Sequence, residues 1–160
     1  MSSSDDVGSA TSTETAELST IDMALEVVQL PVSDVDRAKR FYQSLGWRFD
    51  IDLVVNDDFR TVQFTPVHSQ CSIQFGKGRT TAEPGSAQGL FLVVADIDAA
   101  RADLTSRGVQ VSEVEVQRPP GLEAPEGRSY LAQASFSDPD GNGWVLQEVT
   151  TRLPGREWED

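Results

Sequence analysis

Apolar and polar residues follow two different periods along the first half of this chain. Residues 25–30 form a largely β-branched, apolar run closed by a proline, which predicts a strand. Residues 33–46 place apolar side chains at helical spacing, between a capping Ser or Asp and a terminal glycine, so they predict a helix. Strict alternation predicts a strand at 47–53, and two further strands are expected at 59–65 and 71–75. The expected order is β-α-β-β-β.

The second half repeats this order after a linker at 76–88 that is rich in glycine and proline. The pattern predicts a strand, a helix and three strands, at 89–94, 96–108, 109–116, 130–137 and 144–150. A Pro- and Gly-rich loop at 117–129 and a turn at 138–142 join the last three strands.

The two helices match when the sequence is aligned with itself at an offset of 62 residues. Asp34 then falls on Asp96, and Gly46 falls on Gly108. Agreement of cap and terminal glycine in two equal units indicates an internal repeat. We therefore expect one domain at 23–152, with module 1 at 23–78 and module 2 at 89–152. Residues 1–22 are expected to form a disordered acidic tail and 153–160 a C-terminal tail.

Charge and composition exclude several classes of partner. The 160 residues carry 13 Lys+Arg against 26 Asp+Glu, for a formal net charge of −13. Such a chain repels phosphate backbones and anionic lipid, so neither nucleic acid nor membrane is an expected partner. The sequence lacks an apolar run of the roughly 20 residues that span a bilayer, and it lacks an export signal at its start. With one cysteine, which cannot form an intramolecular disulfide, a cytoplasmic location is expected.

Two motifs together resemble the vicinal oxygen chelate superfamily, which includes glyoxalase I, bleomycin- and fosfomycin-resistance proteins and extradiol dioxygenases. They are V-S-D-V-D-R-A-x-x-F-Y at 32–42 and S-D-P-D-G-N at 137–142. Within that superfamily the chain is most similar to glyoxalase-like, bleomycin-resistance-like proteins. The resemblance implies an α+β fold, in which two tandem βαβββ modules form curled half-barrel sheets around a cavity. It also implies a homodimer.

The resemblance assigns metal ligands to the first and last strand of each module. Carried onto this chain, those positions are Val27, Gly89, Val145 and, in the first module, about Ile73. None of these side chains offers an oxygen, nitrogen or sulfur donor. We therefore expect no metal and no other cofactor.

Strand alternation indicates which side chains line the implied cavity. If Val27 and Val145 face inward, then Gln29 and Gln147 do as well, and Phe91 lies beside Gly89. Cys71 and Phe75 share the face of Ile73. The candidate ligand-binding residues are therefore Gln29, Cys71, Phe75, Phe91 and Gln147. This apolar lining with neutral amides suits an uncharged or weakly polar organic ligand. The glutamines are equally interpretable as satisfied core amides, and core packing is the favoured interpretation of Phe91.

Few residues are candidates for catalysis, and the catalytic residues remain unknown. His68 lies in an expected turn, and Cys71 follows closely, so a nucleophile and base are conceivable there. The favoured function is binding of a small organic molecule without metal. The alternatives are a metal-dependent glyoxalase, lyase, isomerase or dioxygenase, a metal-free enzyme using Cys71 or His68, and a non-catalytic dimer with a filled cavity.

Overall fold

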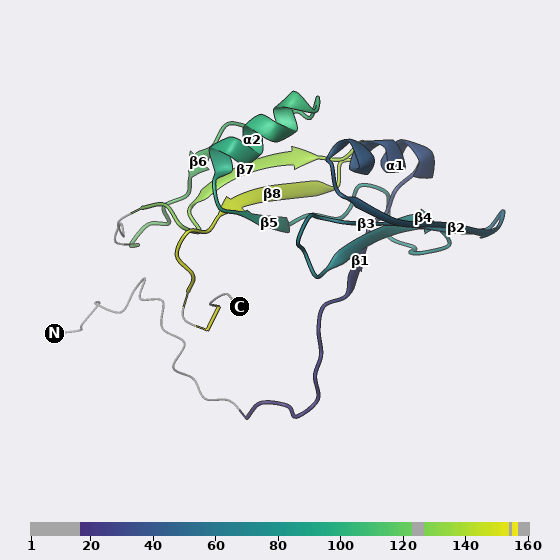
Figure 1. The fold of residues 1–160 in the computed structure, drawn as a ribbon, viewed down its shortest axis with the longest axis horizontal. Coiled ribbons are helices and arrows are strands. Elements are labelled where there is room, and N and C mark those ends of the chain that lie inside the picture. The colour runs from purple at the N-terminus through teal and green to yellow at the C-terminus, as the bar shows by residue number, and fades with distance from the viewer. Residues whose placement is uncertain (1–16, 123–126, 154, 157–160) are drawn as a thin grey trace.

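The computed structural model of this chain describes residues 17–122, 127–153 and 155–156. Most of the expected N-terminal tail, and part of the expected C-terminal tail, lie outside these residues. The described chain contains two four-stranded sheets and two helices (Figure 1). This architecture confirms the predicted α+β fold with two βαβββ modules.

Module 1 supplies sheet A, whose strand order is β1-β4-β3-β2. Its elements are β1 (Val27–Gln29), α1 (Val35–Ser44), β2 (Arg48–Asn56), β3 (Phe59–Thr65) and β4 (Ser72–Lys77). Strand β1 runs parallel to β4, and the other neighbours are antiparallel. Asp34 caps α1 by accepting a hydrogen bond from the Arg37 N–H at 3.0 Å. Gly46 follows the helix with φ of 79°, a left-handed conformation that favours glycine.

Module 2 supplies sheet B, with the equivalent order β5-β8-β7-β6. Its elements are β5 (Leu90–Val94), α2 (Ile97–Ser106), β6 (Glu115–Val116), β7 (Ala132–Ser137) and β8 (Gly143–Glu148). Strand β6 is much shorter than the 109–116 strand expected from the sequence. Before it, a backbone bond from the Ser112 N–H to the Ser135 carbonyl is supplemented by side chains, because Arg101 donates to the carbonyls of Val111 and Ser112, and the Ser112 hydroxyl accepts from the Ser135 N–H.

A buried aromatic cluster joins the two modules. Tyr42 of α1 is fully buried and packs against Phe75 of β4 and Trp144 of β8. The Tyr42 hydroxyl donates to Asp138 Oδ2 at 2.8 Å and accepts from Trp144 Nε1 at 3.0 Å. Burial raises the pKa of Tyr42, and the Asp138 carboxylate raises it further, so the hydroxyl keeps its proton. This contact fixes the first helix against the last turn.

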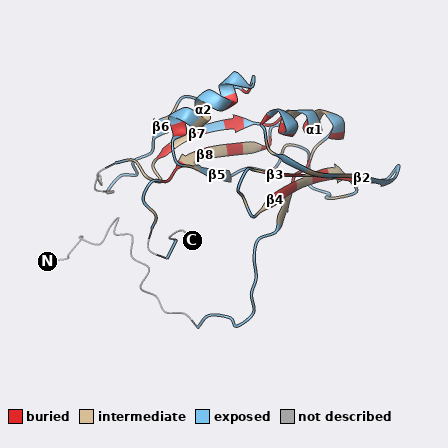
Figure 2. Cartoon of the chain, in the orientation of Figure 1, coloured by how far each residue is buried: buried red, intermediate tan, exposed pale blue. Residues whose placement is uncertain are grey.

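Both helices lie on the same side of the molecule, with α1 over sheet A and α2 over sheet B (Figure 1). We call the opposite side of each sheet its open face. Buried residues lie within the sheets and on the helix faces, whereas residues 17–26 before β1 are exposed (Figure 2). Among the described helices, none is long and apolar enough to cross a membrane.

Candidate functional site

The register of sheet A determines which side chains reach its open face. Val28 pairs with Ile73, and both point toward α1, where Ile73 is 4% exposed. Their neighbours therefore point the other way, because successive side chains of a strand alternate between faces. Gln29 and Gln74 are paired neighbours on the open face, and Gln63 is the cross-strand partner of Gln74.

These side chains form a row of hydrogen bonds across all four strands, which we call the amide ladder: Gln29, Gln74, Gln63 and Asp50. Gln29 Nε2 donates to Gln74 Oε1 at 2.5 Å. Gln74 Nε2 donates to Gln63 Oε1 at 2.7 Å, and Gln63 Nε2 donates to Asp50 Oδ2 at 2.9 Å. All four residues are partly exposed. The row is therefore a polar surface and not part of the core.

Charged groups fix the direction of the ladder at two points. A carboxylate only accepts, so Asp50 requires the Gln63 amide to present its nitrogen. Arg79 Nη2 only donates, and it reaches Gln74 Oε1 at 2.9 Å. These two contacts fix which end of each amide in the ladder carries the oxygen. The last atom of the ladder is then Gln29 Oε1, a buried acceptor with no partner in the described structure. The ladder ends in an unsatisfied acceptor.

Asp50 is the ionised end of the ladder. Burial alone would raise the pKa of this carboxyl, but hydrogen bonds from Arg48, Thr65 and Gln63 together hold the pKa below its usual value. Arg48 Nε lies 2.6 Å from Asp50 Oδ1, and the Thr65 hydroxyl donates to Oδ2 at 2.5 Å. Asp50 reaches this face because β2 has a register shift between Phe49 and Ile51.

The open face of sheet B carries different chemistry. Phe91 pairs with Val145, and Val93 pairs with Gln147, so these four side chains share the face opposite α2. Phe91 is 51% exposed and Val93 is 41% exposed. Gln147 Nε2 donates to the Tyr130 carbonyl at 2.9 Å and is therefore already satisfied. The side chains of β5 and β8 thus make this face mainly apolar.

A cavity of about 280 Å³ lies where the two sheets meet. Cys71 and Ile73 line it from module 1, and Phe91 and Trp144 line it from module 2. The other lining residues are Leu25, Val28, Pro66, Ser69, Ser72, Gly89, Leu90 and Leu92. The cavity is therefore predominantly apolar.

The structure distributes the five predicted ligand-binding residues over three places. Gln29, Phe91 and Gln147 lie on the open faces, and Cys71 lines the cavity between the modules, which Phe91 also reaches. Phe75 lies elsewhere, since it is 0% exposed in the core beneath α1. The face expected for the side chains of β4 was wrong by one residue. A shift of one residue moves every side chain of a strand to the opposite face of the sheet. Gln74, and not Phe75, is the side chain that β4 presents on the open face.

The same correction changes the fourth position that the resemblance assigned to a metal ligand. Val28 and Leu90 are equivalent in the repeat, so their partners Ile73 and Trp144 are equivalent, and Gln74 corresponds to Val145. The four positions therefore hold Val27, Gln74, Gly89 and Val145. The amide oxygen of Gln74 already accepts two hydrogen bonds, and the other three offer no side-chain donor. These residues do not fit a divalent ion, and the described residues contain no group of three His, Cys, Asp or Glu that could hold one.

Cys71 and His68 have environments that do not favour catalysis. Burial raises the pKa of the Cys71 thiol, and the charge of Glu26 raises it further, so less of the nucleophilic thiolate is present. His68 is exposed in the turn between β3 and β4, with φ of 66°.

Sequence reasoning missed Asp50, Gln63, Gln74 and Arg79. Gln63 and Gln74 lie in predicted strands, but their meeting depends on the pairing of β3 with β4. The orientation of Asp50 depends on the register shift in β2, and Arg79 lies beyond the end of β4. The alternation of apolar and polar residues around Gln63 and Gln74 was the one feature of the sequence that could have placed any of these side chains on the open face.

The chain matches a family model described as the Glyoxalase/Bleomycin resistance protein/Dioxygenase superfamily over residues 24–146. It is similar to the solved structure of TnmS3, an antibiotic binding protein from Streptomyces sp. CB03234, with 33% identity and a TM-score of 0.64, covering 82% of this chain and 99% of that one. A glyoxalase/bleomycin resistance protein from the same organism is 34% identical, with a TM-score of 0.60 and coverage of 78% and 99%.

A third similar structure is a member of the Glyoxalase/bleomycin resistance protein/dioxygenase superfamily from Sphaerobacter thermophilus DSM 20745. It is 30% identical, with a TM-score of 0.62, and the match covers 79% of this chain and 98% of that one. No curated protein matches the chain.

Proposed function

We propose, from the premise that this chain belongs to the glyoxalase/bleomycin resistance protein/dioxygenase superfamily, that it binds a small organic molecule without the help of a metal ion. The observation that carries the proposal is the exposed pair of open faces, with the amide ladder on sheet A and the apolar side chains of sheet B. Ligand sites combine apolar contact area with a few polar groups that fix orientation. The similarity to TnmS3, described as antibiotic binding, supports this class of function.

We propose further that the ligand lies between two copies of the chain, in a homodimer. Ile51 and Leu53 on sheet A, and Phe91 and Val93 on sheet B, are each at least 41% exposed on the open faces. Covering exposed apolar side chains is favourable, because it removes apolar surface from water. A second copy laid over these faces encloses a cavity that one chain leaves open.

Fluorescence of the neutral probe N-phenyl-1-naphthylamine tests the binding proposal. The probe is expected to brighten and shift to the blue on addition of the protein, because an apolar site shields it from water. Phe91→Ala removes aromatic area from the open face of sheet B and is expected to weaken binding about tenfold. Val54→Ala is the matched control, since Val54 is 63% exposed but lies on the helix side of β2 beside Arg60.

Two further measurements test the other parts of the proposal. Analytical ultracentrifugation is expected to show a dimer, and a monomer at all concentrations would contradict the shared cavity. Titration with Ni²⁺, Zn²⁺, Mn²⁺ and Fe²⁺, followed by calorimetry, is expected to show no stoichiometric binding. One tightly bound ion per chain would restore the metal-dependent enzyme as the function.

A further inference from the structure

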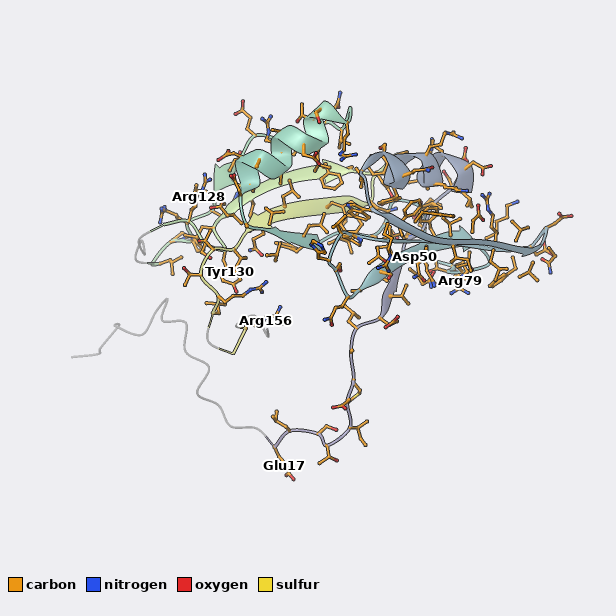
Figure 3. All side chains as sticks on the ribbon, in the orientation of Figure 1. Glu17, Asp50, Arg79, Arg128, Tyr130 and Arg156 are labelled. Carbon is orange, nitrogen blue, oxygen red and sulfur yellow. The ribbon has the colours of Figure 1, made fainter. Side chains whose placement is uncertain are left out.

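Two side chains on the open face of sheet A donate hydrogen bonds to a single atom, Gln74 Oε1. Gln29 Nε2 donates to it at 2.5 Å, and Arg79 Nη2 donates to it at 2.9 Å. The Arg79 guanidinium also lies over the ring of Phe59, 5.2 Å from the ring centroid. Phe59 and Gln74 both point to the open face, so Arg79 lies on that face as well. Figure 3 shows Arg79 beside sheet A, on the side away from the helices, as is Asp50.

Arg79 carries a positive charge that no carboxylate balances within the described structure. The other charges that the strands place on the open face of sheet A are those of Arg48 and Asp50, which pair with each other. The open face of sheet A therefore has one arginine without an ion-pair partner among the described residues.

Arg79 also has an unused donor. Its Nε is buried and has no hydrogen-bond partner among the described residues. A buried donor left without an acceptor is unfavourable, and an acceptor supplied by a ligand would remove that cost. Nη2 is occupied by Gln74, while Phe59 holds the plane of the guanidinium. The remaining N–H groups are therefore presented in a fixed orientation.

The ladder contributes rigidity to this arrangement. Gln74 cannot rotate to release Arg79 without also breaking its bond to Gln63, which is in turn fixed by Asp50. An oriented donor loses less conformational entropy on binding an acceptor than a flexible lysine would.

We propose that Arg79, held by Gln74 and Phe59, forms a subsite for an acidic oxygen of the ligand. This inference rests on the proposed ligand-binding function and specifies the ligand as an apolar, aromatic molecule that carries one carboxylate or ionised phenol. The guanidinium donates to that oxygen through charge-assisted hydrogen bonds, while the aromatic body of the ligand lies along the apolar side chains. The assignment differs from the uncharged ligand expected from the sequence, because Arg79 lies outside the predicted strands.

Calorimetry with two matched probes, 2-naphthoate and 2-naphthamide, tests the subsite on the full chain. The probes have the same ring system and differ in charge, so their ratio of affinities isolates the acidic oxygen. The wild-type protein is expected to bind 2-naphthoate about tenfold more tightly than 2-naphthamide at neutral pH, and the preference is expected to decrease as salt is added. Arg79→Gln is expected to abolish the preference, because it weakens binding of 2-naphthoate far more than binding of 2-naphthamide.

Two further variants sharpen the test. Lys77→Gln removes a neighbouring exposed charge on the helix side of β4, and is expected to retain the full preference. Arg79→Lys keeps the charge but loses the planar guanidinium, and is expected to retain a reduced preference of about threefold. If Arg79→Gln does not fold, the comparison of the wild-type protein with Arg79→Lys still decides the question.

The outcomes separate this inference from the proposed function. Equal affinities of the wild-type protein for the two probes, or a preference that survives Arg79→Gln, would overturn the subsite. If N-phenyl-1-naphthylamine still binds in that case, the ligand-binding proposal stands. Absence of binding of all three probes would overturn both proposals.

Discussion

Sheet A and sheet B can be compared position by position, because their strand orders and pairings are the same. Gln29 corresponds to Phe91, Gln74 to Val145 and Gln63 to Ser135. The first member of each pair belongs to the amide ladder of module 1. The second member is aromatic, aliphatic or a short hydroxyl. The same backbone therefore supports a hydrogen-bonding surface in one module and an apolar surface in the other.

On the helix-facing side, each module has an arginine that bridges a strand carboxylate and an acidic residue in the first turn of its helix. Arg60 bridges Asp52 and the first-turn acid Asp36 of α1, at 2.8 and 2.9 Å. Arg128 likewise bridges Glu148 and the first-turn acid Asp98 of α2, both at 2.9 Å. The two modules therefore have a similar ion bridge between helix and sheet, built from different strand positions, whereas the open faces differ in chemistry at equivalent positions.

The largest expected difference in stability between equivalent substitutions concerns Gly76, whose counterpart in module 2 is Gln147. A Cβ on Gly76 would overlap the carbonyl oxygen of Arg60, which is backbone and cannot give way cheaply. Gly76→Ala is therefore expected to lower the free energy of unfolding by about 3 kcal/mol or more. Gln147→Ala removes one partly exposed side chain and is expected to cost about 1 kcal/mol. Urea denaturation measures both, and equal costs would contradict the close packing of β3 on β4.

The second prediction concerns the turns that end the third strand of each module. Asp138 accepts from the Tyr42 hydroxyl, and also from the backbone and side chain of Asn142, whereas its counterpart Pro66 has no such role. Asp138→Ala leaves buried donors unpaired and is expected to cost about 2–3 kcal/mol. Pro66→Ala is expected to cost less than about 1 kcal/mol. Thermal unfolding of the two variants provides the comparison, and a reversed order would show that the Tyr42 contact is dispensable.

Breaking the amide ladder is expected to have a smaller effect on stability. Gln63→Leu deprives Gln74 of its acceptor and Asp50 of a donor, with an expected cost of about 1 kcal/mol. The pKa of Asp50 is expected to rise, because one of the hydrogen bonds that lower it is lost. Ser135→Ala, at the equivalent position of sheet B, is expected to change stability by less than about 0.5 kcal/mol. Side-chain carboxyl NMR follows the pKa, and an unchanged value would contradict the ladder.

The smallest expected effect is the pH dependence of the ion bridge between Arg60 and Asp52 on the helix side of sheet A. The hydrogen bond from Arg60 lowers the pKa of Asp52, burial raises it, and the hydrogen bond from Lys39 lowers it further. The net result is a pKa of about 2, against an ordinary value of 3.8. A depressed pKa stabilises the fold above pH 4, and this contribution is lost as the pH falls from about 4 to about 2. Asp52→Asn is expected to cost about 0.5 kcal/mol at pH 7, and this cost is expected to vanish below pH 2, where Asp52 is protonated. A cost that stays constant with pH would contradict the ion bridge.

Features that depend on near neighbours in the chain were predictable from the sequence. Asp34 and Asp96 cap their helices as expected, and the glycines at 46 and 108 have the left-handed conformation that ends a helix. Such signals work because a cap involves residues only three apart. The internal repeat then supplied the βαβββ order of both modules.

The amide ladder was not predictable, because it depends on pairing between distant strands. Gln29 and Gln74 are 45 residues apart and meet only through the parallel pairing of β1 with β4. A displacement of one residue in that register exchanges Gln74 with Phe75, and local alternation cannot detect it. Arg79 returns to the sheet after Gly78, which has φ of 71°, and this turn has no periodic signature.

The irregular hydrogen bonding of β2 has a consequence for aggregation. This strand lies at the free edge of sheet A, and Phe49, Ile51, Leu53, Val54 and Val55 are all exposed. A regular edge of this length would act as a template for strands of other chains. Register shifts between Phe49 and Ile51, and between Val54 and Asn56, interrupt the row of backbone groups. The shift that delivers Asp50 to the ladder therefore also protects the edge from pairing into fibrils.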